Sequence, residues 1–339
     1  MTSRARLVAA VLVVALGAVA IWAFTRGGGD DPGIRDDARA RGRSELAVLS
    51  VVGAPNPLVA VIGVHAERPP AALVLPPGVT VVAPGQGETT IEGITALPVE
   101  SVRVAVSNAL GAWVDHYGTI SIDAVTTIVD DRGGLTVDVS EPVTLDGAEV
   151  SVGEAKLSGS QVLAYVSEPG EVAVTRWAEV LEALLATQGL ETGMVGRSDD
   201  PEAFIEVVRG ASGMAVEVPP VAPVADSASI FDQPATDELV RELFGTRPTV
   251  PIVVQNGNGA PNVGEDVAAL LLPEGFRVVL SQNADTFRYR RTEIAATEGE
   301  FADEAQRVRE LLGVGRVVVS QVPSGLADIT IVVGRDFTA

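Results

Sequence analysis

Arginine side chains are the groups in this sequence best suited to chemistry on an anionic ligand, and few of them are clustered. Arg176 lies at the start of an amphipathic helical pattern, where an arginine can hold a phosphate. A single arginine without others nearby holds a phosphate group poorly, so we expect Arg176 to be a surface side chain near Glu179. Three more ligand-binding candidates, in FRYRR, could contact an anionic polymer or form a solvated strand edge: Arg288, Arg290 and Arg291.

Three further features have functional alternatives that the sequence disfavours. DDRGG (130–134) lacks the alternating acidic ligands of a calcium loop, so we expect a turn with glycine at positive φ. NGNGAPNVG (256–264) could hold a phosphate at a helix N-terminus. It has no Gly-Lys-Ser/Thr, which favours a tight strand-to-helix turn capped by Asn262. His116 has no partner nearby in the sequence, so we expect polar surface and not a general base.

Composition excludes several classes of site. The chain has no cysteine, which rules out disulfides and thiolate chemistry. Its two histidines, His65 and His116, are too few for an imidazole-rich metal site. The net charge of -21, from 45 acidic and 24 basic residues, repels nucleic-acid phosphates. We therefore predict no nucleic-acid partner.

The N-terminus indicates a membrane anchor. No residue from Leu7 to Phe24 is charged, and about 17–25 apolar residues span a bilayer. Two arginines precede this run, which predicts a cytoplasmic N-terminus and an extracytoplasmic body. The alternative is a signal peptide cleaved after AVA (18–20), but the apolar run continues beyond it. We predict a cytoplasmic stub and transmembrane helix over residues 1–27 and a polar linker over 28–45.

The remaining sequence alternates apolar β-branched runs with helical patterns, which predicts an α/β fold. In the last part of the chain, after TRPTVP, this alternation predicts parallel βαβ units. Apolar positions recur at helical spacing over 99–114 and again before Gly189, a plausible C-cap. Asp200 followed by proline marks another helix start. TRPTVP interrupts the pattern, and strand–helix alternation then begins again. We predict two domains, residues 46–247 and 248–339.

Segments in both predicted domains resemble known families. DHYGTISIDAVTTIVDDRGGLTVDV and LSGSQVLAYVSE resemble the LytR-CpsA-Psr domain. VVQNGNGAPNVGEDVAALLLPEGFRV, NADTFRYRRTEI and VSQVPSGLADITIVVGRDF resemble, in order, the LytR C-terminal domain that often follows it. The resemblance implies a membrane-anchored extracytoplasmic protein of a Gram-positive bacterium, with an α/β/α sheet domain and a small βαβ domain. Active members of the family transfer a polyprenyl-pyrophosphate-linked glycopolymer onto the cell wall.

Most charged residues that the resemblance implies for this transfer are missing. Arginines and an Asp-held divalent cation would neutralise the pyrophosphate. The family's Arg-Asp pair falls on Pro77 and Gly78, and its metal-binding Asp falls near Asn56 and Pro57. The arginine-rich run after LAYVS is here EPGEVAVTR, which leaves Arg176 alone.

We therefore predict a degenerate, non-catalytic member that binds or regulates wall-polymer assembly, with no catalytic or metal-ligating residue and no cofactor. Its candidate partners are the membrane, a wall glycopolymer, a polyprenyl lipid and an active relative. One alternative is an active phosphotransferase that attaches the glycopolymer to peptidoglycan with Mg²⁺. It requires new arginines, such as Arg103, Arg132 or Arg209, to converge on the site. Another is a lipid carrier with an apolar pocket.

Overall fold

The computed structural model describes residues 44–168, 170–224, 228–297, 299–319 and 326–338. These residues all belong to one compact unit. The predicted anchor, and the predicted linker up to residue 43, lie outside the described residues. Within these ranges, no helix combines the length and apolar character needed to cross a bilayer.

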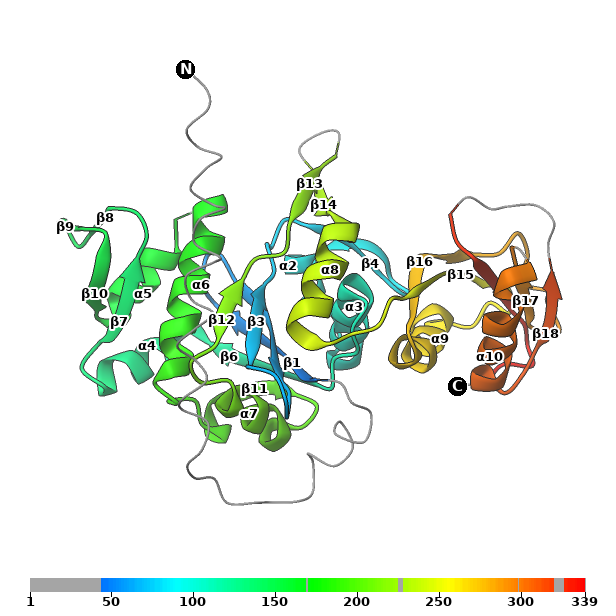
Figure 1. Cartoon of the computed structure of the whole chain (residues 1–339), viewed down its shortest axis with the longest axis horizontal. Helices are drawn as coiled ribbons and strands as arrows, with labels where there is room; N and C mark the ends of the chain where they lie inside the picture. Colours follow the sequence, from blue (N-terminus) through cyan, green and yellow to red (C-terminus); the bar gives the residue numbers. More distant parts are fainter. Residues whose placement is uncertain (1–43, 169, 225–227, 298, 320–325, 339) are drawn as a thin grey trace. The chain divides into compact units, whose positions relative to one another are not determined.

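The larger sheet is mixed (Figure 1). Strands β1–β2, β2–β3 and β6–β11 pair antiparallel, whereas β1–β6 and β3–β12 pair parallel. Short loops and not helices connect its first three strands, so these strands pair antiparallel. Its order is β11 (Val195–Ser198), β6 (His116–Ser121), β1 (Glu45–Val52), β2 (Leu58–Val64), β3 (Ala71–Val74) and β12 (Ala215–Glu217).

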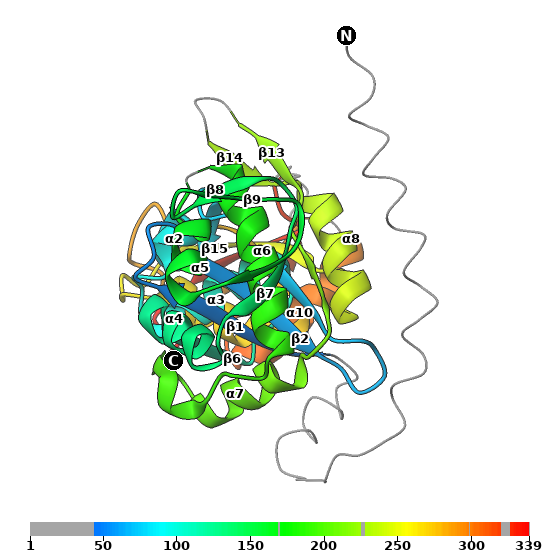
Figure 2. The same cartoon turned by 90° about the vertical axis from the view of Figure 1, so that its left-hand side faces the viewer.

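Helices cover both faces of this sheet (Figures 1 and 2). Successive side chains of a strand point to opposite faces, so Leu46 and Val48 enter one core and Ala47 and Leu49 the other. The first core is completed by α2 (Ile91–Ile94), α3 (Val99–Leu110) and α8 (Gln233–Phe244). The second contains side chains of α4 (Ile122–Asp131), α5 (Gly159–Val166), α6 (Glu171–Ala186) and α7 (Pro201–Gly210).

Local sequence signals explain several helix ends. Asp200 caps α7 by accepting from the N–H groups of Glu202 and Ala203, as predicted. In DDRGG, Gly133 and Gly134 have φ of 71° and 116°, which confirms the predicted turn. Gly189 is not a C-cap, because α6 ends earlier and Thr187 takes that position.

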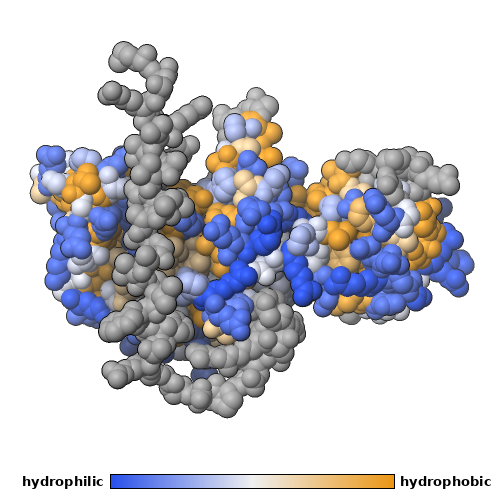
Figure 3. All heavy atoms as spheres, in the orientation of Figure 1, coloured by the Kyte–Doolittle hydropathy of each residue, from blue (hydrophilic) through white to orange (hydrophobic). Residues whose placement is uncertain are grey.

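Short hairpins surround the larger sheet. One of them, β13–β14, exposes apolar side chains, with Val221 at 44% and Ile230 at 43% (Figure 3). The remaining short elements are β4 (Thr80–Ala83), β5 (Gly87–Thr90), β7 (Leu135–Val139), β8 (Val143–Leu145), β9 (Ala148–Val150), β10 (Gly153–Leu157), η1 (Thr192–Met194), β13 (Val221–Pro223) and β14 (Ser229–Phe231).

The last part of the chain forms a second sheet with its own core. The units β15–α9–β16 and β17–α10–β18 are parallel βαβ units, whereas β17 and β19 pair antiparallel. The order is β16 (Phe276–Asn283), β15 (Val250–Asn256), β19 (Ile329–Val333), β17 (Glu293–Ala296) and β18 (Arg316–Val319). The helical elements are α9 (Val263–Leu271), η3 (Leu272–Glu274), η4 (Gly299–Phe301) and α10 (Ala302–Leu312).

Buried polar contacts connect α3 and α8 to β16. The Asn108 amide donates to the Val278 carbonyl at 2.9 Å, and the Asn108 side-chain oxygen accepts from the Val278 N–H at 2.8 Å. The Arg277 guanidinium, 9% exposed, binds both carboxylate oxygens of Asp237 at 2.8 Å. These bonds satisfy groups that would be costly to bury alone, so they fix the register of this contact.

Candidate functional site

Three chain segments meet beside the first turns of α6. The Asn56 amide, in the β1–β2 loop, donates to the carbonyls of Val166 and Glu168 at 3.0 Å each. The Asn56 backbone carbonyl accepts from the Trp177 indole at 2.8 Å. The loop, the end of α5 and the start of α6 are therefore held together by hydrogen bonds to one residue. The Asn56 side chain is the donor in the two bonds to Val166 and Glu168, which an aspartate carboxylate could not make.

Arg176 is buried in this region, and its charge is satisfied within the protein. Its side chain is 7% exposed and donates to a Glu168 carboxylate oxygen at 2.6 Å. It also donates to the Tyr165 carbonyl at 3.1 Å, and its guanidinium lies 4.7 Å from the centre of the Tyr165 ring. The expectation of a surface side chain near Glu179 is wrong. Because Arg176 projects from α6 toward the end of α5, its partners are Glu168 and Tyr165 instead.

The Tyr165 hydroxyl has a partner of its own. It donates to a carboxylate oxygen of Glu179, whose other oxygen accepts from the Ser140 N–H at 3.1 Å. Burial, followed by this hydrogen bond and the Glu179 charge, raises the pKa of Tyr165 well above its usual range. Tyr165 therefore remains a neutral phenol near pH 7, which makes it a poor nucleophile or base.

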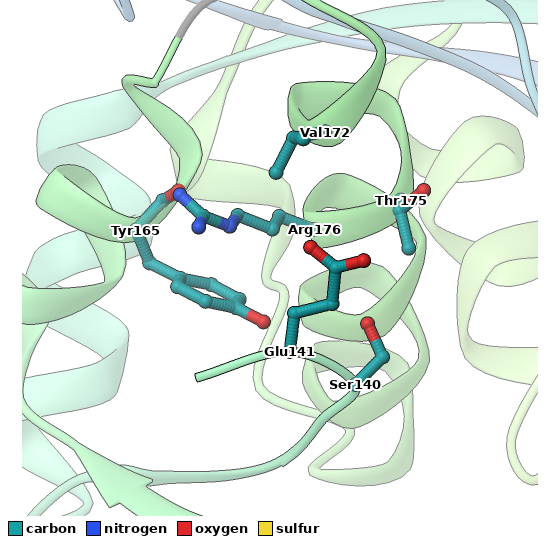
Figure 4. Close-up of a pocket in the computed structure, with 6 residues that line it drawn as sticks. All are labelled: Ser140, Glu141, Tyr165, Val172, Thr175 and Arg176. Atoms are coloured by element: carbon teal, nitrogen blue, oxygen red, sulfur yellow. The ribbon is translucent and has the colours of Figure 1, made fainter. Parts of the chain in front are cut away.

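A cavity of about 220 Å³ opens beside these groups. We call it the arginine cavity; Figure 4 shows Arg176 alongside the Tyr165 ring. Its only lining cation among the described residues is Arg176, and the Glu141 carboxylate also lines it. A pyrophosphate placed here would meet one arginine already paired with a carboxylate, and a second carboxylate nearby. The lining residues are Ser140, Glu141, Tyr165, Val172, Thr175 and Arg176.

The arginines that could have rebuilt a transferase site lie elsewhere. Arg132 donates to the Thr187 hydroxyl at 3.5 Å, and Arg209 donates to the Leu190 carbonyl at 3.2 Å. Arg103 belongs to a separate cluster. None of the three lines the arginine cavity.

The position of the missing Arg-Asp pair is also uncharged in the structure. The Pro77 carbonyl accepts from the Glu92 N–H at 2.9 Å. A Cβ atom added at Gly78 would have no other atom within 4 Å. The place that an aspartate side chain would take is therefore open. In the described ranges, no three His, Asp or Glu side chains lie close enough together to hold a metal ion.

His116 forms a cluster that the sequence did not reveal. Its Nε2 lies 3.2 Å from a Glu45 carboxylate oxygen, and its Nδ1 lies 3.7 Å from an Asp199 oxygen. Asp199 also pairs with Arg103 at 3.1 Å and accepts from the Tyr117 N–H at 2.7 Å. The expectation of an unpartnered polar surface residue is therefore wrong, because strand pairing and loop packing bring together carboxylates that are far apart in the sequence.

The charges of this cluster are mutually stabilised. Burial lowers the pKa of His116, but the Asp199 and Glu45 carboxylates outweigh it and raise that pKa to about 9. Burial also raises the pKa of Asp199. His116, the Tyr117 N–H and Arg103 outweigh this effect and lower that pKa to about 2. His116 is therefore protonated near pH 7 and cannot serve there as a general base.

The FRYRR arginines do not join the arginine cavity. Arg288, Arg290 and Arg291 are exposed in the loop between β16 and β17, so the strand-edge alternative is wrong. The loop is fixed at Tyr289, whose N–H donates to the Gly257 carbonyl at 3.2 Å. Asn262 occupies the position before α9 at a φ of 59°, but its side chain makes no capping hydrogen bond, contrary to expectation.

Comparison with known families agrees with this order of domains. The LytR_cpsA_psr family model matches residues 90–168. The model described as LytR cell envelope-related transcriptional attenuator matches residues 249–337. The chain is a LytR-CpsA-Psr family protein with a LytR C-terminal domain. The first match contains β6, α4 and α5, and it ends at Glu168, the partner of Arg176.

Solved structures of LytR-CpsA-Psr proteins share the fold. ywtF from Bacillus subtilis is 18% identical, with a TM-score of 0.51, and the match covers 64% of this chain and 92% of that one. TagT bound to LI-WTA is also 18% identical, with a TM-score of 0.51 and coverage of 64% and 93%. YwtF (TagT) with bound octaprenyl pyrophosphate lipid is 18% identical, with a TM-score of 0.49 and coverage of 64% and 92%. No curated protein matches the sequence.

Proposed function

We propose that this LytR-CpsA-Psr protein is a non-catalytic, membrane-anchored component of a Gram-positive cell envelope that binds or regulates wall-polymer assembly. The observation that carries the proposal is the state of Arg176. Its charge is paired with Glu168 at 2.6 Å and lies over the Tyr165 ring, in a cavity with no second lining cation among the described residues.

The energetics of pyrophosphate transfer support this proposal. A transferase must hold a concentrated negative charge and stabilise more of it as the bond breaks. Removing one preorganised donor from such a site typically costs about 100–1,000-fold in rate. Here the family's Arg-Asp pair falls on Pro77 and Gly78, and its metal-binding carboxylate falls near Asn56 and Pro57. Arg176 is already bonded to Glu168. The effects of residues in one site are not additive, but the remaining catalysis is expected to be near background.

A transfer assay with the full-length protein tests the proposal. The donor is a polyprenyl-pyrophosphate-linked glycopolymer and the acceptor is peptidoglycan, with Mg²⁺, with Mn²⁺ or without metal. We expect no transfer above the level without enzyme. Turnover that disappears in Arg176→Ala, while a folded Arg241→Ala variant keeps it, would establish the phosphotransferase alternative. Arg241 is a suitable control because it forms an exposed pair with Glu238 within α8.

A binding measurement tests the positive part of the proposal. Purified cell-wall sacculi with and without their attached polymer are sedimented together with the protein. We expect retention only by sacculi that carry polymer. Equal recovery in the supernatant with both preparations, together with no effect on an active family member added to the transfer assay, would contradict both binding and regulation.

The proposed topology rests on the uncharged run from Leu7 to Phe24 and the arginines before it. Protease added to intact protoplasts is expected to digest the body of the protein. Complete protection of the body would contradict an extracytoplasmic location.

A further inference from the structure

A second cavity lies where strands β15 and β16 end and α9 begins. Its volume is about 380 Å³, against about 220 Å³ for the arginine cavity. The two strands are parallel, and the carboxyl ends of parallel strands are where α/β sheets commonly bind ligands. We call it the amide cavity, after its polar lining: Gln86, Asn256, Asn262, Ser281, Gln282 and Asn283.

The amide cavity is polar but uncharged. None of the described residues that line it is Asp, Glu, Lys or Arg. Each amide side chain offers both donors and an acceptor, as the hydroxyl groups of a sugar do. An anion is disfavoured here, because Glu265 and Asp266 occupy the first turn of α9 and oppose the attraction of the helix N-terminus. The lining therefore suits a neutral, hydroxyl-rich ligand.

One part of the lining is held rigidly. Asn256 donates to the Ala260 carbonyl at 2.7 Å and accepts from the Gly259 N–H at 2.8 Å, which fixes the loop before α9. The Ser281 hydroxyl accepts from the Gly85 N–H at 3.1 Å, which fixes the β4–β5 turn against β16. These bonds preorganise the walls before any ligand binds, which lowers the entropic cost of binding.

Another part of the lining is available to a ligand. Gln282 and Asn283 are exposed at the end of β16, and neither side chain forms a hydrogen bond with another described residue. Their backbone lies in the ladder between β15 and β16, opposite Gln255 and Asn256. The two uncommitted side chains leave β16 on opposite faces, and both residues line the cavity at a fixed strand end.

An exposed aromatic ring lies next to the same loop. Phe287 is 45% exposed, and a Cβ added at Gly259 would lie 3.1 Å from the Phe287 side chain. Gly259 also has a φ of +80°, so a glycine suits both the backbone and the close approach. An aromatic face next to hydrogen-bonding amides can cover the apolar C–H face of a pyranose ring.

We propose that the amide cavity binds a neutral oligosaccharide segment of a cell-wall glycan. Gln282 and Asn283 bind its hydroxyl groups, and Phe287 covers one ring face. The inference rests on the proposed function for its ligand class, a wall polymer, and it assigns the contact to the LytR C-terminal domain. The recognised chemistry is uncharged sugar and not phosphate.

Saturation-transfer NMR on the full-length protein tests this proposal. The probes are neutral tetrasaccharides of glucose, galactose and N-acetylglucosamine, each measured alone, and a phosphorylated form of each. We expect at least one neutral probe to bind with a Kd of about 1 mM, and its phosphorylated form to bind more weakly. Absence of binding by all neutral probes at about 10 mM, or tighter binding of the phosphorylated forms, would overturn the proposal.

Variants locate the site. The double substitution Gln282→Ala and Asn283→Ala is expected to weaken binding by about tenfold or more, since two ligand hydrogen bonds are lost. Gln306→Ala is the matched control: its amide lies on α10, away from this cavity, and binds Glu310 at 3.0 Å. The control is expected to bind like the wild type, and thermal unfolding checks that all forms are folded. Equal affinity of the double variant and the wild type would place the sugar elsewhere.

The two proposals can fail separately. Transfer of glycopolymer would overturn the non-catalytic function without moving the sugar-binding result. If the wild type binds none of the neutral probes while its polymer-dependent retention on sacculi persists, the assignment to the amide cavity is overturned and the proposed function stands.

Discussion

The arginine cavity contains a cation that the protein itself already satisfies, whereas the amide cavity contains two uncharged side chains with no described partner. Arg176 is 7% exposed and bonded to Glu168 and Tyr165. Gln282 and Asn283 are exposed at a strand end. A polar residue is available to a ligand only when folding has not already provided its partner. By this criterion, the polar groups of the arginine cavity are less available to a ligand than those of the amide cavity.

This comparison predicts that Arg176 is mainly structural. Arg176→Ala removes a buried guanidinium, its bonds to Glu168 and the Tyr165 carbonyl, and its packing on the Tyr165 ring. We expect the free energy of unfolding to fall by about 2–4 kcal/mol, somewhat below a fully buried pair because Glu168 is 56% exposed. Chemical denaturation provides the measurement, with the exposed pair variant Arg241→Ala as control. A loss of less than about 1 kcal/mol for Arg176→Ala would contradict a structural role.

Asn56 offers a second way to test the arginine cavity. Asn56→Asp replaces an amide that donates to the carbonyls of Val166 and Glu168 with a carboxylate that faces them. We expect a loss of about 1–3 kcal/mol in the free energy of unfolding at pH 7. We also expect Mg²⁺ not to restore it, because the described residues contain no group of three His, Asp or Glu side chains that could hold a metal ion. Recovery of stability with Mg²⁺ would show that this position retains the environment of a metal site.

The His116 cluster, which belongs to neither cavity, predicts a pH dependence. The pKa of His116 is about 9 in the folded protein and 6.5 as its ordinary value. Its contribution to stability is therefore complete below the ordinary value and is lost as the pH rises through about 9. Between about pH 6 and pH 10, we expect the free energy of unfolding of the wild type to fall by about 1–2 kcal/mol more than that of His116→Gln.

The measurement is the difference between the two unfolding free energies at each pH. The titration of Asp199 does not affect this difference between about pH 6 and pH 10. Its pKa is lowered to about 2, so its contribution to stability is lost only in acid. Parallel pH profiles for the two proteins would mean that His116 is not held protonated by Asp199 and Glu45.

The smallest expected effect is that of Glu168→Gln. The carboxylate is 56% exposed, so its ion pair with Arg176 is partly screened by solvent. We expect a loss of about 0.2–1 kcal/mol in the free energy of unfolding. Isothermal titration calorimetry with inorganic pyrophosphate compares the two proteins further. We expect the variant to bind pyrophosphate more tightly, because the Arg176 guanidinium no longer has a carboxylate as its partner. Stronger binding of pyrophosphate by the wild type than by the variant would contradict the view that Glu168 blocks Arg176.

The sequence was sufficient for features that depend on nearby residues. Helical spacing of apolar side chains indicated α3 and α6, Asp200 with its proline marked the start of α7, and the glycines of DDRGG marked a turn. Caps and periodicity act over one or two helical turns, so they can be read along the chain. The family segments and the lack of clustered charge were also visible without a structure.

Tertiary structure alone decided which polar groups are engaged. His116 has Glu45 and Asp199 as partners, Arg176 is buried against Tyr165, and the antiparallel strand β17 joins a largely parallel sheet. Each depends on contacts between segments that are not neighbours in the sequence. The sequence by itself determined that this chain has few charges to bring to a pyrophosphate. The fold decided that the expected arginine is already paired with Glu168, and that the amides of Gln282 and Asn283 at the end of β16 have no described partner. Both outcomes depend on which distant segments the topology brings together.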